Sequence, residues 1–229
     1  MSFRLSYRAD PGNPWFSWQY VRDNSDTILT ALREHTSLTV RAVLIAVLIA
    51  VPLAVAAYWF RALAGPILAV TGVLYTIPSL ALFAFLAPYL GIGVVTVLTV
   101  VVLYALLVIV RNALAGLTQV PPEVREAAEG MGYGRWGRLF RIDLPLALPG
   151  ILTGLRLATV STVALVTVGV VVGRGGLGQL IFAGFQNNFY KAQIMTGTLL
   201  CVLLALVFDL ALAGAGRLLT PWLRRRSAA

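Results

Sequence analysis

The sequence predicts an all-α integral membrane protein with five core transmembrane helices and a charged helix–turn–helix between the third and the fourth. Composition is the first indication: hydrophobic residues make up 59% of the 229 residues and charged residues only 12%. A soluble domain carries about 25% charge, so this chain cannot cover a water-exposed surface. The second indication is pattern, because five apolar segments approach the roughly 20 residues that a helix needs to cross the hydrocarbon core.

The five predicted spans cover residues 40–60, 63–87, 92–110, 150–172 and 193–216. Helices are the expected spanning form, because open sheet edges would leave backbone groups unpaired in lipid. Prolines lie inside the first two spans, and each removes a backbone donor and should bend its helix.

Two ionisable residues are predicted to pair inside the bundle. Asp209 lies in the fifth span and Arg156 in the fourth. An ionisable group in a span is costly unless it is partnered. Each residue lies about two turns from the same end of its span, at 1.5 Å per residue, so the two should share a depth. Arg217 is a second candidate partner that reaches Asp209 by snorkelling.

Arginine counting predicts the orientation. The net charge of +9 comes from arginines that flank apolar runs, which is typical of the positive-inside rule rather than of nucleic-acid binding. Residues 111–149 and the basic tail 220–229 are therefore placed in the cytoplasm. Residues 1–38 form an extracytoplasmic or interfacial segment and 39–219 the transmembrane domain. The first 38 residues lack an apolar core and do not resemble a secretory signal.

Metal and disulfide chemistry are not indicated. The chain has a single cysteine, Cys201, and a single histidine, His35, which excludes a disulfide framework and a multi-histidine or cysteine metal site. A lone histidine beside a span is expected to be an interfacial polar residue.

The stretch VGRGGLGQLIF contains Gly173, Gly175 and Gly178 in the G-x-G-x-x-G spacing of dinucleotide-binding loops. That reading fails, because the preceding apolar run is the end of a span and no acidic residue follows at about 20 positions. The glycines instead predict a tight re-entry after span four, followed by a short amphipathic segment at the outer surface. The chain also lacks a phosphate-binding P-loop, so any ATP must be bound by another chain.

Residues 119–149 form the one long charged insertion. Pro121 and Pro122 are suited to open a helix, and Gly130, Gly132 and Gly134 are suited to close it. A second short helix, RWGRLFRIDL, is expected to stop before Pro145. The pair should lie along the membrane surface with its apolar residues, Trp136, Leu139 and Phe140, against lipid or the bundle and its arginines in water.

Seven fixed positions of this loop resemble a known family. They reproduce the E-A-A-x3-G-x9-I-x-L-P motif of ABC-importer permeases without a departure, and they comprise Glu126, Ala127, Ala128, Gly132, Ile142, Leu144 and Pro145. The stretch YTIPSLALFAFLAPYLGIG resembles the osmoprotectant branch, which transports glycine betaine, carnitine or choline. The glycine loop also resembles that branch, except that Arg174 replaces a small residue. The likeness covers about Leu32 to Leu219.

The resemblance implies a transport subunit of the bacterial inner membrane rather than an enzyme. The loop would be a coupling helix that docks on one of two separate ATPase subunits, which bind ATP and Mg. Two permease subunits, identical or sister, would form the pathway, and an extracytoplasmic binding protein would deliver the solute. This chain itself would hold no cofactor and no metal.

The residues of the solute pathway are only weakly indicated. Tyr75, Pro78 and Tyr104 are the candidates. The two tyrosines are chosen because aromatic side chains attract a quaternary ammonium ion through cation–π interactions, and Pro78 because a bent helix suits a pathway. Two alternatives stay open: an importer of the same architecture for another solute such as methionine, and a membrane-embedded enzyme.

Overall fold

The computed structural model describes residues 12–222, and within that range its regular secondary structure is helical. Ten α-helices follow one another along the chain, and they are α1 (Trp18–Asp23), α2 (Ser25–Trp59), α3 (Arg61–Thr76), α4 (Ser79–Leu90), α5 (Val94–Thr118), α6 (Pro122–Gly130), α7 (Arg135–Arg138), α8 (Leu144–Val168), α9 (Leu177–Gln186) and α10 (Lys191–Leu219). A π-helical turn, η1 (Leu139–Asp143), precedes α8, and a 3-10 turn, η2 (Gly169–Val172), follows it.

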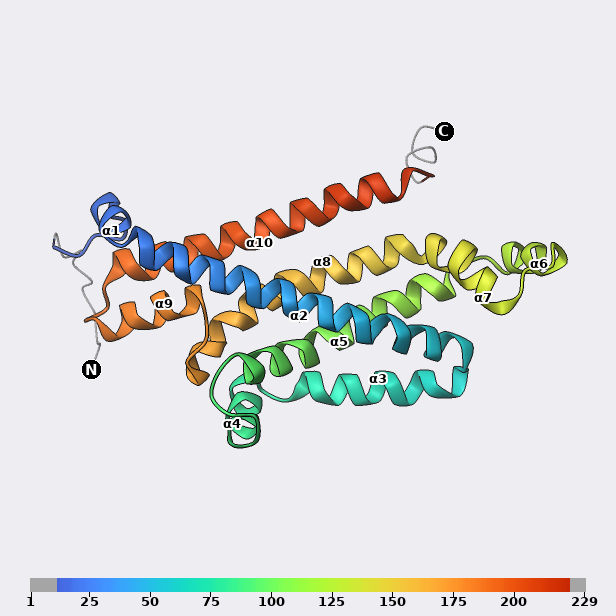
Figure 1. Ribbon diagram of the computed structural model, residues 1–229, viewed down its shortest axis with the longest axis horizontal. Helices are drawn as coiled ribbons and strands as arrows, with labels where there is room; N and C mark the ends of the chain where they lie inside the picture. The colour runs from blue at the N-terminus through green and yellow to red at the C-terminus, as the bar shows by residue number, and fades with distance from the viewer. Residues whose placement is uncertain (1–11, 223–229) are drawn as a thin grey trace, which may run out of the picture.

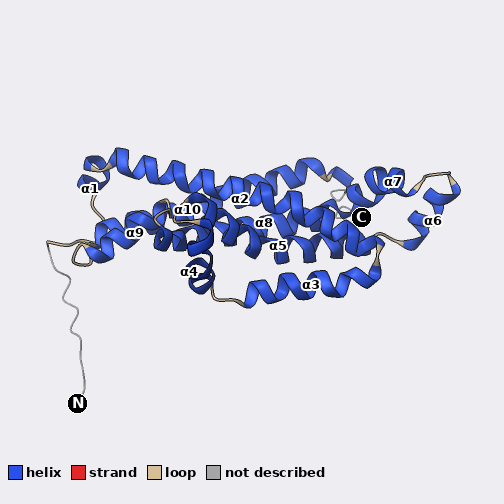
Figure 2. Cartoon of the chain, turned by 60° about the horizontal axis from the view of Figure 1, so that its bottom comes forward, coloured by secondary structure: helices blue, strands red, loops and turns tan. Residues whose placement is uncertain are grey.

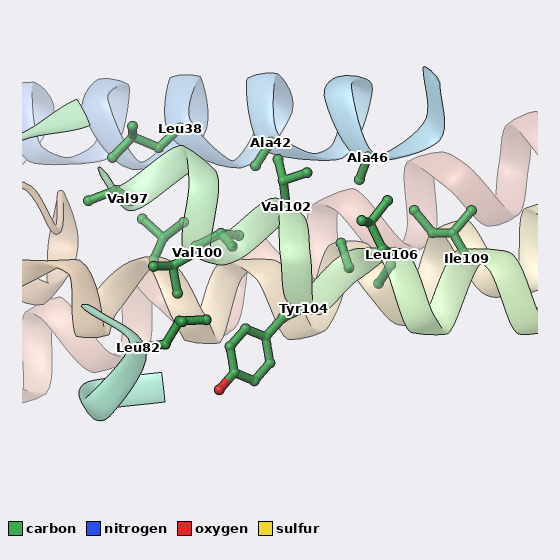
Figure 3. Packing of buried hydrophobic residues seen from close by; sticks show 14 of the residues in the cluster. Leu38, Ala42, Ala46, Leu82, Val97, Val100, Val102, Tyr104, Leu106 and Ile109 are labelled. Atoms are coloured by element: carbon green, nitrogen blue, oxygen red, sulfur yellow. The ribbon is translucent and has the colours of Figure 1, made fainter. Parts of the chain in front are cut away.

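The core lies around α5, which is flanked by α2 and α8 along most of its length (Figure 1). Valines and alanines dominate its contacts, and Val97, Val100 and Ala42 are fully buried (Figure 3). Small side chains allow such helices to approach closely in a membrane, where the hydrophobic effect does not drive helices together. α10 differs, because its most apolar stretch of 18 residues contains no residue that is buried by the rest of the described chain.

Four helical runs of the described residues are long and apolar enough to cross a membrane, namely α2, α5, the run Arg135–Val172 and α10. The pair α3 and α4 passes the same test only when taken together, and its two helices meet at 96°. The all-helical membrane fold is therefore confirmed, and the described residues contain four candidate spans, or five if the bent pair counts as one.

The second predicted span, 63–87, is not one bent helix as expected but two helices separated by a break at Ile77 and Pro78. Ile77 adopts φ −66° and ψ 128°, an extended conformation. A residue before proline is pushed out of the helical region by the proline ring, so the break follows from Pro78. Pro52, in contrast, lies inside α2, which continues through it.

The helix that corresponds to the predicted first span, α2, is longer than that span. α2 begins at Ser25 and has 35 residues, about 52 Å at 1.5 Å per residue. Residues 25–38 thus belong to the same helix as span one and extend beyond a hydrocarbon core of about 30 Å. Their inner face packs on α9, where Ile28 and Ala31 share a buried cluster with Leu177 and Leu180.

The expected partnership of Asp209 with Arg156 is confirmed, but the pair does not lie inside the bundle of this chain, because the Arg156 and Asp209 side chains stay 40% and 30% exposed. The arginine Nε donates to Oδ1 and Nη2 to Oδ2, both at 2.8 Å, which is a bidentate contact between α8 and α10. A planar guanidinium matches both oxygens of one carboxylate.

The loops gather at two opposite ends of the bundle (Figures 1 and 2). α6 and α7 lie at one end, and α1, α9 and the short α4 lie toward the other. This separation divides the candidate functional residues into a charged end and a glycine-rich end.

Candidate functional site

The charged end is organised by α6 and its C-terminal turn. Pro122 occupies the first turn of α6, as expected, where a missing N–H costs nothing. At the other end the Tyr133 N–H donates to the Ala128 carbonyl and the Gly132 N–H to the Glu129 carbonyl. With Gly132 at φ 82°, these two bonds form a Schellman motif. Of the three glycines expected to close the helix, Gly132 is therefore the one at the left-handed position.

The structure places the first half of the E-A-A motif on one short helix. Glu126 and Ala127 are exposed, whereas Ala128 is fully buried. Gly132 is exposed at the turn, and a Cβ there would meet nothing within 4 Å. The exposed motif residues are thus available to a partner, while Ala128 seats the helix on its own chain.

The second half of the motif differs from the prediction. The helix that contains Arg135 does not stop before Pro145; it passes through the π-turn η1 directly into α8. Pro145 lies in the first turn of α8, and the wider π-turn accommodates a ring that would clash with the carbonyl four residues earlier. Ile142, Leu144 and Pro145 are all half-buried. The loop therefore consists of a separate helix, α6, followed by α7 and η1, which continue directly into α8.

Aromatic and aliphatic side chains seat this extension on the end of α2. Leu139 is buried in a cluster with Val55, Ala113 and Ala147. Trp136 contacts Trp59 edge-to-face, with ring centroids 4.6 Å apart. Leu139 faces the bundle as expected, whereas Trp136 and Phe140 remain largely exposed.

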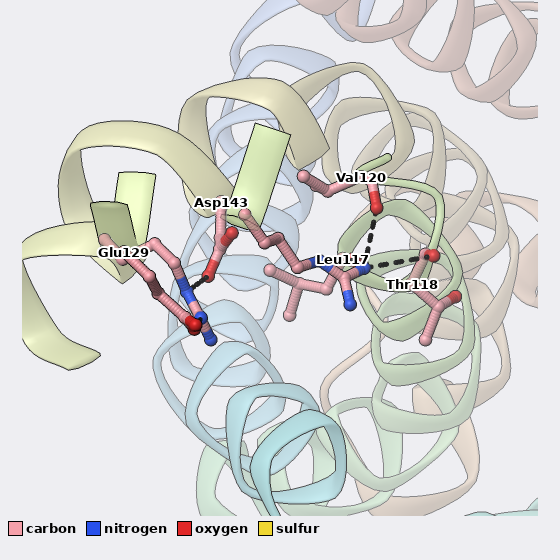
Figure 4. Close-up of polar contacts among 7 residues, drawn as sticks. Leu117, Thr118, Val120, Glu129 and Asp143 are labelled. Carbon is pink, nitrogen blue, oxygen red and sulfur yellow. Dashed lines mark hydrogen bonds and ion pairs between the residues drawn. The ribbon is translucent and has the colours of Figure 1, made fainter. Parts of the chain in front are cut away.

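The arginines of the loop do not all face water, contrary to the prediction. The Arg125 Nη2 donates to the Val120 carbonyl at 2.7 Å and, at 3.4 Å, to the Leu117 and Thr118 carbonyls at the end of α5 (Figure 4). Its guanidinium also lies over the ring of Tyr58, 5.3 Å from the centroid. Arg125 therefore satisfies helix-end carbonyls that would otherwise lack donors.

Arg138 is the second inward arginine. Its Nε donates to the Asp143 Oδ2 at 3.3 Å, and its Nη1 contacts the Glu129 carboxylate (Figure 4). Asp143 is fully buried. Sequence analysis missed this carboxylate, although an acidic residue between the motif positions Ile142 and Leu144, at the start of an apolar span, is an available signal.

The three candidate pathway residues meet at the break between α3 and α4. The rings of Tyr75 and Tyr104 lie 5.5 Å apart between centroids. The Tyr104 hydroxyl donates to the carbonyl of Ile77, directly before Pro78. Tyr104 is nearly buried (Figure 3), while Tyr75 and Pro78 are exposed. The tertiary hydrogen bond satisfies a carbonyl that the broken helix leaves open.

At the opposite end, the expected tight re-entry after span four is confirmed. Gly173 and Gly176 adopt φ of 76° and 51°. A Cβ on Gly178 would lie 2.3 Å from the Thr167 carbonyl oxygen, and one on Gly175 would lie 2.7 Å from the Val170 nitrogen. The glycines allow the loop to pack onto the end of α8, and α9 follows as the predicted short helix.

His35 anchors this loop, so the expectation of an interfacial histidine is wrong. The side chain is fully buried. Its Nδ1 accepts from the Leu177 N–H at 3.3 Å, so Nε2 carries the proton and donates to the Val163 carbonyl at 3.0 Å. The histidine therefore links α2 to α8 and α9. Arg174 replaces a small residue of the osmoprotectant branch in the glycine loop. Its Nη1 lies 3.6 Å from Oε1 of Glu34, the residue before His35.

Comparisons with known proteins agree with the motif. The family model of the binding-protein-dependent transport system inner membrane component matches residues 32–225. The osmoprotectant import permease protein OsmW of Salmonella typhimurium is 38% identical, over 88% of this chain and 96% of its own. The Bacillus subtilis choline permease protein OpuBB is 35% identical, over 89% and 93% of the two chains. The glycine betaine/carnitine/choline permease protein OpuCB of the same bacterium is 32% identical, over 88% of this chain and 93% of its own.

The fold is also shared with a solved structure. An inward-facing form of the MetNI methionine ABC transporter superposes with a TM-score of 0.77 at 21% identity, covering 86% of this chain and 98% of that chain. At this identity the likeness concerns the fold alone. Since the family model spans most of the chain and the relatives align over nearly their whole length, this chain belongs to the family of inner-membrane components of binding-protein-dependent transport systems.

Proposed function

We propose that this chain is the permease subunit of an ATP-driven importer for a quaternary-ammonium osmoprotectant such as glycine betaine, choline or carnitine. The observation that carries the proposal is the similarity to osmoprotectant and choline permeases along 88% of the chain or more. The intact E-A-A motif between the third and fourth predicted spans supports the same conclusion.

In this proposal α6 docks on a separate ATPase subunit through its exposed residues Glu126 and Ala127. Two ATPase subunits bind ATP with Mg, and this chain binds no cofactor or metal of its own. A second permease subunit, identical or sister, completes the pathway. An extracytoplasmic binding protein delivers the solute to the glycine-rich end. The arginine-rich end and the C-terminus then lie in the cytoplasm and the N-terminal segment outside, with α3 and α4 as the second of five spans.

The proposed solute contact is the aromatic pair Tyr75 and Tyr104 at the α3–α4 break. Cation–π attraction to one ring is worth about 0.5–2 kcal/mol, so two adjacent rings suit a quaternary ammonium group. Tyr75→Leu should therefore raise the KM for choline by about two- to thirtyfold. Tyr89→Leu is the matched control, because Tyr89 is an exposed aromatic of α4 at 75%. Equal KM values for the two variants would remove Tyr75 from the pathway.

The test of the function is uptake by the reconstituted importer. The chain is purified with its ATPase, placed in proteoliposomes with ATP inside, and given its binding protein with radiolabelled glycine betaine, choline, carnitine or methionine. ATP-dependent uptake of at least one quaternary ammonium solute, and not of methionine, is expected. Uptake of methionine alone would favour the alternative of an importer of the same architecture for another solute.

A further inference from the structure

The link between α6 and the rest of the loop is soft at the backbone. α6 ends at Gly130 and α7 begins at Arg135, and Gly132 and Gly134 lie between them. Glycine permits many backbone conformations, so this turn alone would let α6 rock against α7. A push on α6 would then be lost in the turn rather than passed to a span.

Arg138 bridges that turn. On one side its guanidinium contacts Glu129, the second-last residue of α6, nine positions earlier in the chain. On the other side it donates to Asp143, the last residue of η1. One side chain thus joins the helix before the glycine turn to the helix after it, as Figure 4 shows around Glu129 and Asp143.

The anchor of this bridge is buried and the outer contact is not. Asp143 is 0% exposed, whereas the Glu129 side chain is 61% exposed. A buried carboxylate is held strongly by its one charged partner, because separation would leave an uncompensated charge. The buried hydroxyl of Tyr58, at the end of α2, also interacts with the Asp143 carboxylate. Arg138 is therefore held by a carboxylate that lies directly before α8 and also interacts with α2.

Arg125 provides a second connection from the same helix. It lies in α6 and donates to the carbonyls of Leu117 and Thr118 at the end of α5 and to that of Val120 just beyond it. α6 is thereby tied to α5 by Arg125 at its start and to α8 by Arg138 at its end. Two attachment points prevent rotation about either one.

We propose that Arg138 is a positioning residue that couples movement of α6 to α8 by bridging Glu129 and Asp143 across the glycine turn. The inference rests on the proposed function, in which an ATPase moves α6. Arg138 touches neither solute nor ATP, and the geometry gives it the task of stiffening the loop. Loss of the bridge should leave ATP hydrolysis intact but make it less productive.

The first experiment measures solute molecules imported per ATP hydrolysed in proteoliposomes containing the whole importer. Glu129→Gln removes the exposed contact and leaves the buried pair intact, so folding is retained. An exposed ion pair is worth about 0.2–1 kcal/mol, so the transport-to-ATP ratio should fall by about 1.4- to fivefold. Arg141→Gln, an exposed arginine of the same π-turn, is the matched control and should keep the parent ratio.

The second experiment separates stiffening from general stability. Glu129→Cys and Arg138→Cys are combined in a Cys201→Ser background, and the ratio is measured before and after a short bis-thiol cross-linker. The cross-linker carries two thiol-reactive groups, so each cysteine forms a thioether with one of them and no oxidant is needed. The unlinked form should be uncoupled, and cross-linking should restore the ratio toward that of the parent. A merely structural arginine would not respond to the cross-link.

Three outcomes would overturn the inference: an unchanged ratio in Glu129→Gln, hydrolysis and transport falling in parallel, or no recovery on cross-linking. The proposed function fails separately. If the parent importer shows no ATP-dependent uptake of any solute offered, the function is wrong before any variant is compared.

Discussion

Replacing Gly132 tests whether the turn after α6 is needed for its shape or for its small size. Gly132 adopts φ 82°, and a Cβ there would meet no atom of this chain within 4 Å. Gly132→Ala therefore introduces backbone strain without a clash. Gly134→Ala is the matched control, since Gly134 lies two residues on, is equally open, and adopts φ −69°.

The strain sets the size of the expected effect. A residue with a Cβ costs about 1–2 kcal/mol in the left-handed region. α6 has only nine residues, and isolated helices shorter than about 12 residues are marginal in water. The cost should therefore fall on the turn itself and raise the ratio of its open to its folded form by about 5- to 30-fold.

Hydrogen exchange reports this population directly. The amide of Tyr133 is bonded to the Ala128 carbonyl by the Schellman turn, and its exchange should accelerate by about 5- to 30-fold in Gly132→Ala. The amide should keep its protection in Gly134→Ala. Equal exchange in the two variants would refute the assignment of the turn.

The functional readout then distinguishes shape from size. Asp and Asn tolerate the left-handed region better than Ala does, so Gly132→Asp should be less strained than Gly132→Ala but bulkier. If coupling of ATP hydrolysis to transport is lost more in Gly132→Asp, the turn fits closely against the ATPase. If it is lost more in Gly132→Ala, backbone conformation is what matters.

Three further predictions concern the bundle. Asp209→Asn and Arg156→Gln should each lower the melting temperature in detergent. The double variant should lose less than the sum of the two single losses, because no lone charge remains. Strictly additive losses would exclude the pair. Gly178→Ala should destabilise the protein by about 1–3 kcal/mol by overpacking against the α8 backbone, and an unchanged melting temperature would contradict that packing. Ser227→Cys, outside the described residues, should resist a membrane-impermeant thiol reagent in intact cells in a Cys201→Ser background, whereas labelling would reverse the orientation.

Hydropathy located helices but not their ends. The predicted span 193–216 falls inside α10, which covers 191–219, whereas the predicted span 92–110 begins two residues before α5 and ends eight residues before the end of that helix at 118. α2 departs furthest, because its first 15 residues are polar or mixed and still helical. Apolar runs mark the part of a helix that suits lipid, whereas a helix continues into water as long as its backbone bonds and its packing persist.

Proline gave three different outcomes that sequence alone did not separate. Pro52 lies within a continuous helix, Pro78 marks a 96° break, and Pro145 lies in the first turn of α8. Local sterics are alike at all three. At Pro78 the break exposes the carbonyl of Ile77, and the hydroxyl of Tyr104, from another helix, donates a hydrogen bond to it. This partner, which stabilises the break, lies 27 residues away along the chain.

The buried polar groups were the least predictable part of the candidate site, and His35 shows why. Its two partners are backbone atoms of Val163 and Leu177, which are 128 and 142 residues away in the sequence. Every residue but proline has the same N–H and C=O, so a backbone partner leaves no compositional signal. Burial of a polar side chain is tolerated where such bonds satisfy it, and only the fold brings those bonds together. The motif at Glu126 to Pro145 was readable because its side chains recur at fixed spacing, whereas the contacts of His35 depend on where the backbone runs.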